Sequence, residues 1–288
     1  MELAAQQAIE IISIDSALVY RDMDTGTAKP TPAERASVAH HLIDVIDPTD
    51  TLSVADTCRQ VQCAAESIVQ RGKTPVCVGG TMMTVHALLN GLSDLPEADV
   101  HIRQTLDAQA SEIGWPAMHA RLSTLDPESA QKIKPNDAQR IQRALEVYAV
   151  LGTPLSQVQG RRTQFLSGFS PQLCLLLPED RTALHLRIEQ RLRSMFELGL
   201  VEEVQGLQKK YKLDAQMTSM RAVGYRQVWA HLAGELTWAE CQAQSLFATR
   251  QLAKRQITWM RSILRDLQGT ACQVIDPFKN PLRNLRIN

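Results

Sequence analysis

Residues 9–30 of the chain read IEIISIDSALVYRDMDTGTAKP, and this stretch decides how the rest of the sequence is interpreted. It opens with a short, β-branched apolar run, residues 9–14, that ends abruptly at Asp15 and Ser16. An apolar run of this length between polar residues is typical of a buried strand in a parallel sheet. Ligands of open α/β sheets bind beyond the carboxyl ends of the strands, so the sequence predicts Asp15 and Ser16 at a binding edge.

The polar residues after this strand admit two interpretations. A glycine-containing loop, residues 22–30, carries Lys29. A carboxylate, a hydroxyl and a lysine in one crevice would suit proton transfer and the binding of an anionic group. The structural alternative is that Asp15 or Ser16 only caps the next helix, where both residue types are favoured. The stretch by itself leaves both interpretations open.

Composition limits the class of protein. The chain has 288 residues, of which 44% are hydrophobic and 22% charged, so it can bury a sizeable core. Lys plus Arg equals Asp plus Glu at 31 each, so the net charge gives no indication of a nucleic-acid partner. The six cysteines include no C-x-x-C pair, which argues against a zinc site or a disulfide framework. No apolar run approaches the ~18 residues of a membrane span, and we expect a cytoplasmic protein without a membrane partner.

The hydrophobic pattern predicts an α/β fold, a parallel sheet flanked by helices, with a mainly helical insertion. Residues 1–95 and 166–288 are expected to form the core, and residues 96–165 the insertion. Further strands are predicted at residues 40–46, 74–78, 173–177 and 273–276. Helices are predicted at residues 54–72, 81–89 and 181–211 with a break at Gly199, and one or two helices at residues 237–268, with a polar tail to Asn288 after the last strand.

Two local patterns could bind anions. Gly79-Gly80-Thr81 lies between a predicted strand and a predicted helix, which is the geometry that directs backbone N–H groups at a phosphate. The other pattern is the segment 250–265, which contains five Arg or Lys residues and no acid. Such a stripe neutralises phosphates, and Tyr225 and Trp259 offer planar faces for unstacked bases. The structural alternatives are a tight turn with Thr81 as helix cap, and a solvated helix face with Trp259 in the core.

Several motifs, in order along the chain, resemble those of the tRNA dimethylallyltransferases, also called tRNA isopentenyltransferases. The match covers nearly the whole chain, and the number of ordered motifs makes it specific. The motifs are residues 11–30, Val78-Gly79-Gly80-Thr81, Asn136-Asp137-Ala138-Gln139-Arg140, Ala144-Leu145-Glu146-Val147, Val223-Gly224-Tyr225-Arg226-Gln227, and residues 249–256 (TRQLAKRQ).

One family feature is missing from the sequence. The resemblance implies a P-loop NTPase-like core that begins with a strand and a G-x-x-x-x-G-K-[ST] phosphate loop, and this motif occurs nowhere in the chain. Residues 2–8 are expected to be the remnant of the helix after that loop. The chain could be truncated, have a start that was placed too late, or have lost the loop and with it alkyl transfer.

The resemblance implies transfer of a dimethylallyl group from dimethylallyl diphosphate to N6 of an adenosine next to the anticodon, position 37, of tRNA. Asp15 matches the family's general base, which takes the proton of N6 as the bond forms. Mg²⁺ and cationic side chains would stabilise the departing diphosphate. Lys29 is added as a diphosphate-binding candidate from its charge and position alone.

Family positions also assign candidate contacts with the anticodon stem-loop. Thr81 and Arg103 match two further positions near the substrate and complete the candidate catalytic set with Asp15. We expect the protein to act as a monomer. The candidate tRNA contacts are Asp15, Ser16, Ala17, Leu18, Gln139, Arg140, Ile141, Gln142, Arg143, Arg221, Ala222, Val223, Gly224, Tyr225, Arg226, Lys254, Arg255, Gln256, Ile257, Thr258, Trp259, Met260 and Arg261.

Two other classes of protein remain as alternatives. One is a truncated, catalytically impaired tRNA-binding homologue that keeps the basic surface and has lost diphosphate binding. The other is a nucleotide kinase of similar α/β build. It is disfavoured because a kinase needs the phosphate loop and has no use for the DSAL and RQLAKRQ segments.

Overall fold

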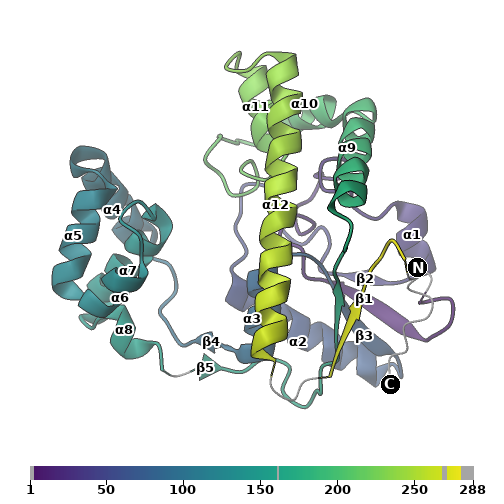
Figure 1. The fold of residues 1–288 in the computed structure, drawn as a ribbon, viewed down its shortest axis with the longest axis horizontal. Helices are drawn as coiled ribbons and strands as arrows, with labels where there is room; N and C mark the ends of the chain where they lie inside the picture. Colours follow the sequence, from purple (N-terminus) through teal and green to yellow (C-terminus); the bar gives the residue numbers. More distant parts are fainter. Residues whose placement is uncertain (1–2, 161, 268–270, 280–288) are drawn as a thin grey trace. The chain divides into compact units, whose positions relative to one another are not determined.

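The computed structural model describes residues 3–160, 162–267 and 271–279, which fall into two compact units (Figure 1). Unit 1 comprises residues 1–89 and 165–288, and unit 2 comprises residues 90–164. The sequence predicted an insertion over residues 96–165. The chain is α/β, with parallel strands in unit 1 flanked by helices. No helix in the described part is both long and apolar enough to cross a membrane.

Unit 1 is built on a parallel three-stranded sheet in the order β2-β1-β3. The central strand is the predicted one, β1 (Ile9–Ser13), and Ile12 is fully buried. It pairs in parallel with β3 (Thr74–Val78), from Ile9 opposite Thr74 to Ser13 opposite Val78. A separate parallel pair is formed by β6 (Leu173–Leu176) and β7 (Cys272–Ile275).

The strand predicted at residues 40–46 is much shorter in the structure. Only β2 (His40–His41) pairs with β1. Leu42 and Asp44 have φ angles of 60° and 58°, which a strand cannot accommodate. The turned backbone brings the Asp44 carboxylate to Lys29 and Arg35, with Nζ–Oδ1 and Nη1–Oδ2 distances of 2.5 and 2.7 Å. A long-range ion cluster therefore overrides the local apolar pattern.

The helices of unit 1 follow the predicted pattern closely. Gly199, with a φ of 92°, separates two helices in the region predicted as 181–211, and Trp238–Asp266 form one long helix in the region predicted as one or two helices. In Figure 1 this long helix, α12, runs beside α9 and extends to α3. The helices are α1 (Pro32–Ser37), α2 (Val54–Gln70), α3 (Met82–Asn90), α9 (Arg181–Glu197), α10 (Leu200–Lys210), α11 (Tyr225–Leu232) and α12 (Trp238–Asp266).

The two ends of the chain differ from expectation or fall outside the description. Residues 3–7 form a single turn, in which Gln6 and Gln7 donate backbone N–H groups to the Leu3 carbonyl, rather than the expected helix remnant. Residue 2 of that predicted remnant and residues 280–288 of the predicted polar tail lie outside the described residues.

Unit 2 is helical with its own apolar core, which includes the fully buried Met118, Leu122 and Ile141. A short antiparallel pair, β4 with β5, lies at its two ends in the sequence. Its elements are β4 (Leu92–Ser93), α4 (Val100–Ile113), α5 (Trp115–Leu125), α6 (Pro127–Lys132), α7 (Ala138–Leu151), α8 (Leu155–Val158) and β5 (Arg162–Thr163).

The amino end of the sheet is held by one buried carboxylate. Glu10 on β1 accepts hydrogen bonds from Arg71 and Lys73, and lies 2.7 Å from Nε2 of His41. The Glu10 side chain is only 5% exposed. The hydrogen bond from Arg71, partly opposed by burial and supported by His41 and Lys73, lowers the pKa of Glu10 from 4.5 to about 2. The carboxylate is therefore ionised in the folded protein.

Replacing this carboxylate tests its role in stability. Because the pKa of Glu10 is depressed in the folded state, its contribution is fully present above pH 4.5 and is lost as the pH falls towards about 2. We expect Glu10→Gln to lower the free energy of unfolding at pH 7 by about 1–3 kcal/mol and to flatten its fall in that acid range. Urea unfolding at several pH values measures both effects. The exposed Glu235→Gln is the control, and an unchanged acid slope in Glu10→Gln would contradict the assignment.

Candidate active site

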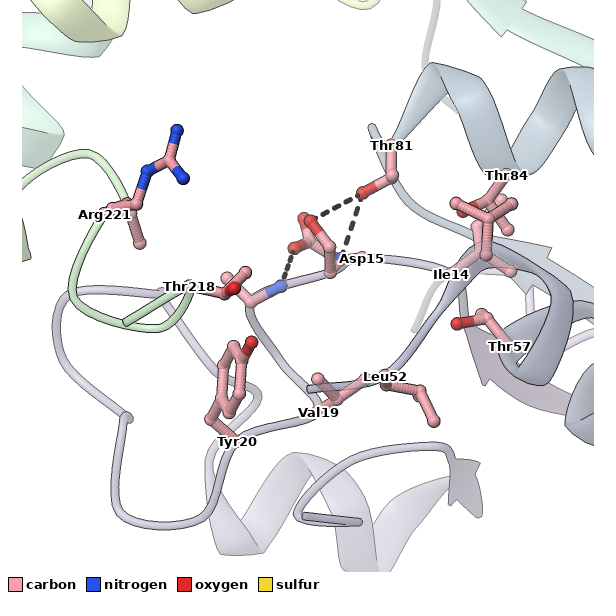
Figure 2. Close-up of a pocket in the computed structure, with 14 residues that line it drawn as sticks. Ile14, Asp15, Val19, Tyr20, Leu52, Thr57, Thr81, Thr84, Thr218 and Arg221 are labelled. Carbon is pink, nitrogen blue, oxygen red and sulfur yellow. Dashed lines mark hydrogen bonds between the residues drawn. The ribbon is translucent and has the colours of Figure 1, made fainter. Parts of the chain in front are cut away.

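A cavity of about 200 Å³ lies at the carboxyl ends of β1 and β3. Figure 2 shows Thr84 and Ile14 on one side of it, Val19, Tyr20 and Leu52 on another and Thr81 on a third, with Asp15 near the middle of the view. Its lining combines an apolar floor with hydroxyls, one carboxylate and one guanidinium. The lining residues are Ile14, Asp15, Ser16, Ala17, Val19, Tyr20, Leu52, Val54, Thr57, Thr81, Thr84, Thr218, Arg221 and Ala222.

The ends of the two strands approach each other unusually closely. The β1–β3 pairing continues beyond β1, because Ile14 donates its N–H to the Val78 carbonyl at 2.9 Å. A Cβ at Gly79 would lie 2.8 Å from the backbone N of Asp15, closer than real Cβ contacts allow. Residue 79 must therefore be glycine for Asp15 and the chain after β3 to meet.

Asp15 is partly exposed and lines the cavity. Its Oδ1 accepts a hydrogen bond from the backbone N–H of Ala17 at 2.8 Å, which fixes the carboxylate (Figure 2). No hydrogen bond to its Oδ2 is found in the described part of the chain, so this oxygen can accept a proton or a hydrogen bond from a ligand. Residues 16–19 form turns, not a helix, so the capping alternative for Asp15 and Ser16 was wrong.

Thr81 connects the ends of the two strands. Its Oγ1 accepts from the backbone N–H of Ser16 at 2.9 Å and lies 3.2 Å from Ser16 Oγ. The predicted Gly-Gly-Thr turn thus places its hydroxyl beside the acid. Thr81 immediately precedes α3, and the sequence predicted both the turn and this helix.

The structure brings an arginine towards Asp15 that the sequence analysis missed. Arg191 lies on α9, and although the residue is exposed overall, desolvation of its guanidinium lowers its pKa. The charge of Asp15 raises that pKa and the charge of Arg187 lowers it. Arg187 and Arg191 share a helix face at i, i+4 spacing, and this pattern after a strand was the available signal.

Lys29 does not line the cavity. Its Nζ donates to the Tyr20 carbonyl and pairs with Asp24 and Asp44 at 2.7 and 2.5 Å, and its side chain is 1% exposed. The prediction placed this ammonium on a diphosphate. In the structure the ammonium is buried within the loop, because the left-handed backbone at Asp44 places the Asp44 carboxylate beside it.

Tyr225 is fully buried and cannot serve as a stacking face for a base, contrary to the prediction. Its hydroxyl donates to Glu203 on α10. The same carboxylate accepts from the backbone N–H groups of Asp24, Thr25 and Gly26. Burial raises the pKa of Tyr225, and the Glu203 charge adds to this effect. Tyr225 thus anchors the loop after β1 to the helices.

The other residues of the segment 221–226 lie at the cavity, on the surface or beneath it. Arg221 and Ala222 line the cavity, and Arg226 is exposed. No ion pair of Arg221 is found among the described residues, so its guanidinium is available to an anion. Gly224 is buried at the start of α11 with a φ of 92°, and Val223 is partly buried.

Helix α12 contacts the turn after β3 through the side-chain amide of Gln256. Gln256 donates to the Gly80 carbonyl at 2.9 Å, and the Trp259 ring meets His86 of α3 edge-on with centroids 6.0 Å apart. Ile257 is turned into the core, and Met260 is partly buried. The exposed members of the predicted contact set on this helix are Lys254, Arg255, Thr258 and Arg261.

Leu18 of unit 1 is partly buried outside the cavity lining, and the remaining predicted residues belong to unit 2. Arg103 on α4 and Arg143 on α7 both bond the buried Glu146. Arg140 is 69% exposed and pairs with Asp137, and Ile141 is fully buried. Gln142 donates to Asp107 at 2.6 Å, and Gln139 is exposed.

The residues of the cavity permit a limited role for Mg²⁺. No group of three His, Cys, Asp or Glu residues that could hold a metal ion occurs in the described ranges. Mg²⁺ commonly takes one or two protein carboxylates and completes its shell with substrate phosphates and water. Asp15 and the Ser16 and Thr81 hydroxyls are the oxygen donors at this edge that fit such a partial shell.

Comparison with known proteins gives a consistent result. Residues 18–263 match the family described as IPP transferase. A tRNA dimethylallyltransferase of Burkholderia cenocepacia (strain HI2424) is 49% identical over 268 residues, which are 91% of this chain and 82% of that protein. A tRNA dimethylallyltransferase of Azoarcus sp. (strain BH72) is 50% identical over 266 residues, again 91% and 82% of the two chains.

Solved structures agree with these relatives. The full-length tRNA isopentenylpyrophosphate transferase of Bacillus halodurans superimposes with a TM-score of 0.63 at 34% identity, covering 95% of this chain and 83% of that one. A eukaryotic dimethylallyltransferase acting on tRNA superimposes with a TM-score of 0.78 at 25% identity, covering 98% and 71%.

The enclosed ammonium of Lys29 gives a stability test. We expect Lys29→Met to lower the free energy of unfolding by about 2–4 kcal/mol, because it leaves Asp24 and Asp44 without their shared cation. Thermal or urea unfolding measures this decrease. The control is Lys132→Met, whose 68% exposed side chain pairs with Glu128, and it should cost under about 1 kcal/mol. Equal effects of the two substitutions would contradict the buried role.

Proposed function

The chain belongs to the IPP transferase family, and from this premise we propose the reaction of its site. It is a tRNA dimethylallyltransferase, a prenyl transferase that modifies tRNA. In the proposed reaction a dimethylallyl group passes from dimethylallyl diphosphate to N6 of the adenosine next to the anticodon, position 37. The observation that carries the proposal is the carboxylate of Asp15, fixed at the mouth of a cavity that also holds Thr81 and Arg221.

The cavity is suited to a flat or branched apolar group, and its own polar groups can bind the polar edge of a base beside that group. Its floor is formed by Ile14, Val19 and Leu52, and Asp15 stands beside hydroxyls. An adenine can reach such a site only after leaving its base stack, at a cost of a few kcal/mol. The apolar floor and the hydrogen-bonding groups of the site would offset that cost.

The proton transfer is assigned to Asp15. As N6 attacks the allylic carbon, the bond from that carbon to the diphosphate oxygen breaks, and the proton of N6 passes to the free Oδ2 of Asp15. The bond from Ala17 N–H keeps the carboxylate oriented. The Thr81 hydroxyl holds Ser16, and so keeps the turn that carries Asp15 in place.

The leaving diphosphate needs positive charge. Arg221 at the cavity and Arg191 near Asp15 are the candidates in unit 1. Fixed cations aimed at a developing charge are commonly a large catalytic contribution. Mg²⁺, when bound, would neutralise diphosphate oxygens, with the Ser16 and Thr81 hydroxyls as the neighbouring protein oxygens, because Asp15 is assigned to the proton. The donor, Mg²⁺, a monomeric state and a cytoplasmic location are proposals supported by the family resemblance alone.

The tRNA would be held by the exposed basic residues. Lys254, Arg255 and Arg261 on α12 have no acidic neighbour in sequence, and Arg226 is exposed at the start of α11. Arg140 offers a further exposed cation in unit 2. Phosphate contacts of this kind make affinity fall with salt concentration.

The alternative of a non-catalytic tRNA-binding homologue is not favoured. The relatives of about 50% identity that are named above are called transferases, and the candidate base is held in an open cavity. Binding of dimethylallyl diphosphate to the purified chain separates the two functions, because only the enzyme requires it. Isothermal titration with the diphosphate, followed by a transfer assay with tRNA, provides the test.

Removal of the candidate base should separate chemistry from binding. We expect Asp15→Asn to lower the turnover rate by about 10²–10⁴-fold, because the amide cannot take the N6 proton. The Kd for tRNA should change by no more than a few fold. Single-turnover dimethylallyl transfer and RNA binding measure the two effects. The control is Asp50→Asn, at an exposed acid outside the cavity. Near-normal turnover in Asp15→Asn would show that another group is the base.

The basic surface can be tested through salt dependence. We expect Arg255→Ala and Arg140→Ala to weaken tRNA binding and to make the slope of log K against log salt shallower by about 0.7–0.9 for each phosphate that the variant no longer neutralises. Fluorescence anisotropy with labelled tRNA gives both quantities. Arg121→Ala, an exposed arginine on α5, is the control and should keep the slope. An unchanged slope in Arg255→Ala or Arg140→Ala would exclude that residue from phosphate contact.

A further inference from the structure

Unit 2 contains a buried carboxylate whose role the proposed reaction leaves unexplained. Glu146 lies on α7, and its side chain is 0% exposed. Its Oε1 accepts from the backbone N–H of Asp99 at 2.9 Å and from Nε of Arg103 at 2.8 Å. Its Oε2 accepts from Nη2 of Arg103 at 3.1 Å and from Nη1 of Arg143 at 2.7 Å.

The two arginines are held firmly yet remain accessible. Their side chains are 41% and 28% exposed, for Arg103 and Arg143 respectively. Arg103 meets the carboxylate in a bidentate fork, and Arg143 has a second fixed bond from Nη2 to the Pro96 carbonyl at 2.6 Å. No partner of Arg103 Nη1 or Arg143 Nε is found in the described part of unit 2. Both guanidinium groups thus keep donors in fixed directions.

The charge balance of this cluster favours an anion. One carboxylate and two guanidinium groups leave a net charge of +1 at a partly exposed site. Burial raises the pKa of Glu146, and the hydrogen bonds from Arg103 and Arg143 outweigh this and lower it below the usual value. Glu146 is therefore ionised, and it orients both arginines without cancelling both charges.

Core stability is a weak explanation for such an arrangement. A buried ion pair repays little of its desolvation cost, and an apolar side chain of similar volume commonly serves a core as well. The neighbouring Ile141, Ala144 and Leu145 already form an apolar face on α7. A carboxylate at this position is better explained by what it does to the two arginines.

We infer that Glu146 is a positioning residue for tRNA binding, which holds Arg103 and Arg143 in the orientation that receives phosphate oxygens of the tRNA. The inference rests on the proposed function, because it takes tRNA as the ligand. Glu146 itself does not touch the RNA. Because it fixes both arginine side chains before binding, they lose less conformational entropy when the RNA binds than two free arginines would.

The substitution Glu146→Gln distinguishes positioning from simple charge. It removes a negative charge beside the RNA-binding surface, so electrostatics alone would make tRNA bind more tightly. Loss of positioning would instead weaken binding, by roughly tenfold, because an amide keeps a single accepting oxygen and would turn its NH₂ group towards N–H donors that Glu146 now accepts. The salt slope should become shallower by about 0.7–0.9 for each phosphate that the misplaced arginines fail to reach.

The experiment measures binding of a labelled anticodon stem-loop to the full chain by anisotropy over a range of salt concentrations. The matched control is Asp126→Asn, because Asp126 is also a buried carboxylate of unit 2 but accepts from Ser129 and Ser156 instead of from arginines. Circular dichroism melting of each variant reports whether unit 2 stays folded. Asp126→Asn should lose stability while it keeps the wild-type affinity and salt slope.

A double-mutant cycle with Arg103→Gln completes the test. This variant leaves Glu146 paired with Arg143, so no buried charge is stranded. In the wild-type background we expect Arg103→Gln to weaken binding about tenfold, and in the Glu146→Gln background less than about threefold, because the arginine is already misplaced. Because Arg103 and Glu146 are in direct contact, a structural role could also give non-additive losses, so the cycle is read only from variants whose melting curves show that unit 2 stays folded.

The outcomes are distinguishable. Weaker binding in Glu146→Gln with non-additive loss, while Asp126→Asn binds normally, supports the inference. Equal or tighter binding in Glu146→Gln, or additive losses in the cycle, overturns it and leaves the transferase function standing. Failure of the wild-type chain to bind the stem-loop at all would overturn the proposed function together with this inference.

Discussion

The site depends on the close contact between the ends of two parallel strands. The backbone bond from Ile14 to Val78 extends the β1–β3 pairing past β1, and Gly79 lets the chains touch where a Cβ would collide with Asp15. The position of the candidate base follows from this contact. It places Ser16 within reach of Thr81, and the turn that results presents the Asp15 carboxylate.

Much of this arrangement could be predicted from the sequence, because its causes are local. A short β-branched run ending in Asp15 indicated a buried strand with an acid at its binding edge, and Gly-Gly-Thr indicated the turn beside it. Those patterns depend on strand periodicity and on the few residues that tolerate tight turns. The long helices and the break at Gly199 were predictable for the same reason.

The failed predictions share a different cause, which is long-range pairing. Lys29 looked like a free cation, but Asp44 reaches it only through a left-handed backbone 15 residues later. Tyr225 looked like a surface aromatic beside two arginines, but Glu203 and the loop at Asp24 enclose its hydroxyl. No window of sequence contains both partners of these contacts. Arg191 escaped notice for the same reason, since its relation to Asp15 exists only in the fold.

The carboxylate of Glu10 gives the sheet two unequal ends. It gathers His41 from β2 and both Arg71 and Lys73 from the turn before β3, so one group ties all three strands together at their amino ends. That end carries ionic contacts, whereas the opposite end carries the cavity with its hydroxyls, one carboxylate and one guanidinium. The sheet thus separates two demands, with a cluster that serves stability at its amino end and the candidate reactive groups at its carboxyl end.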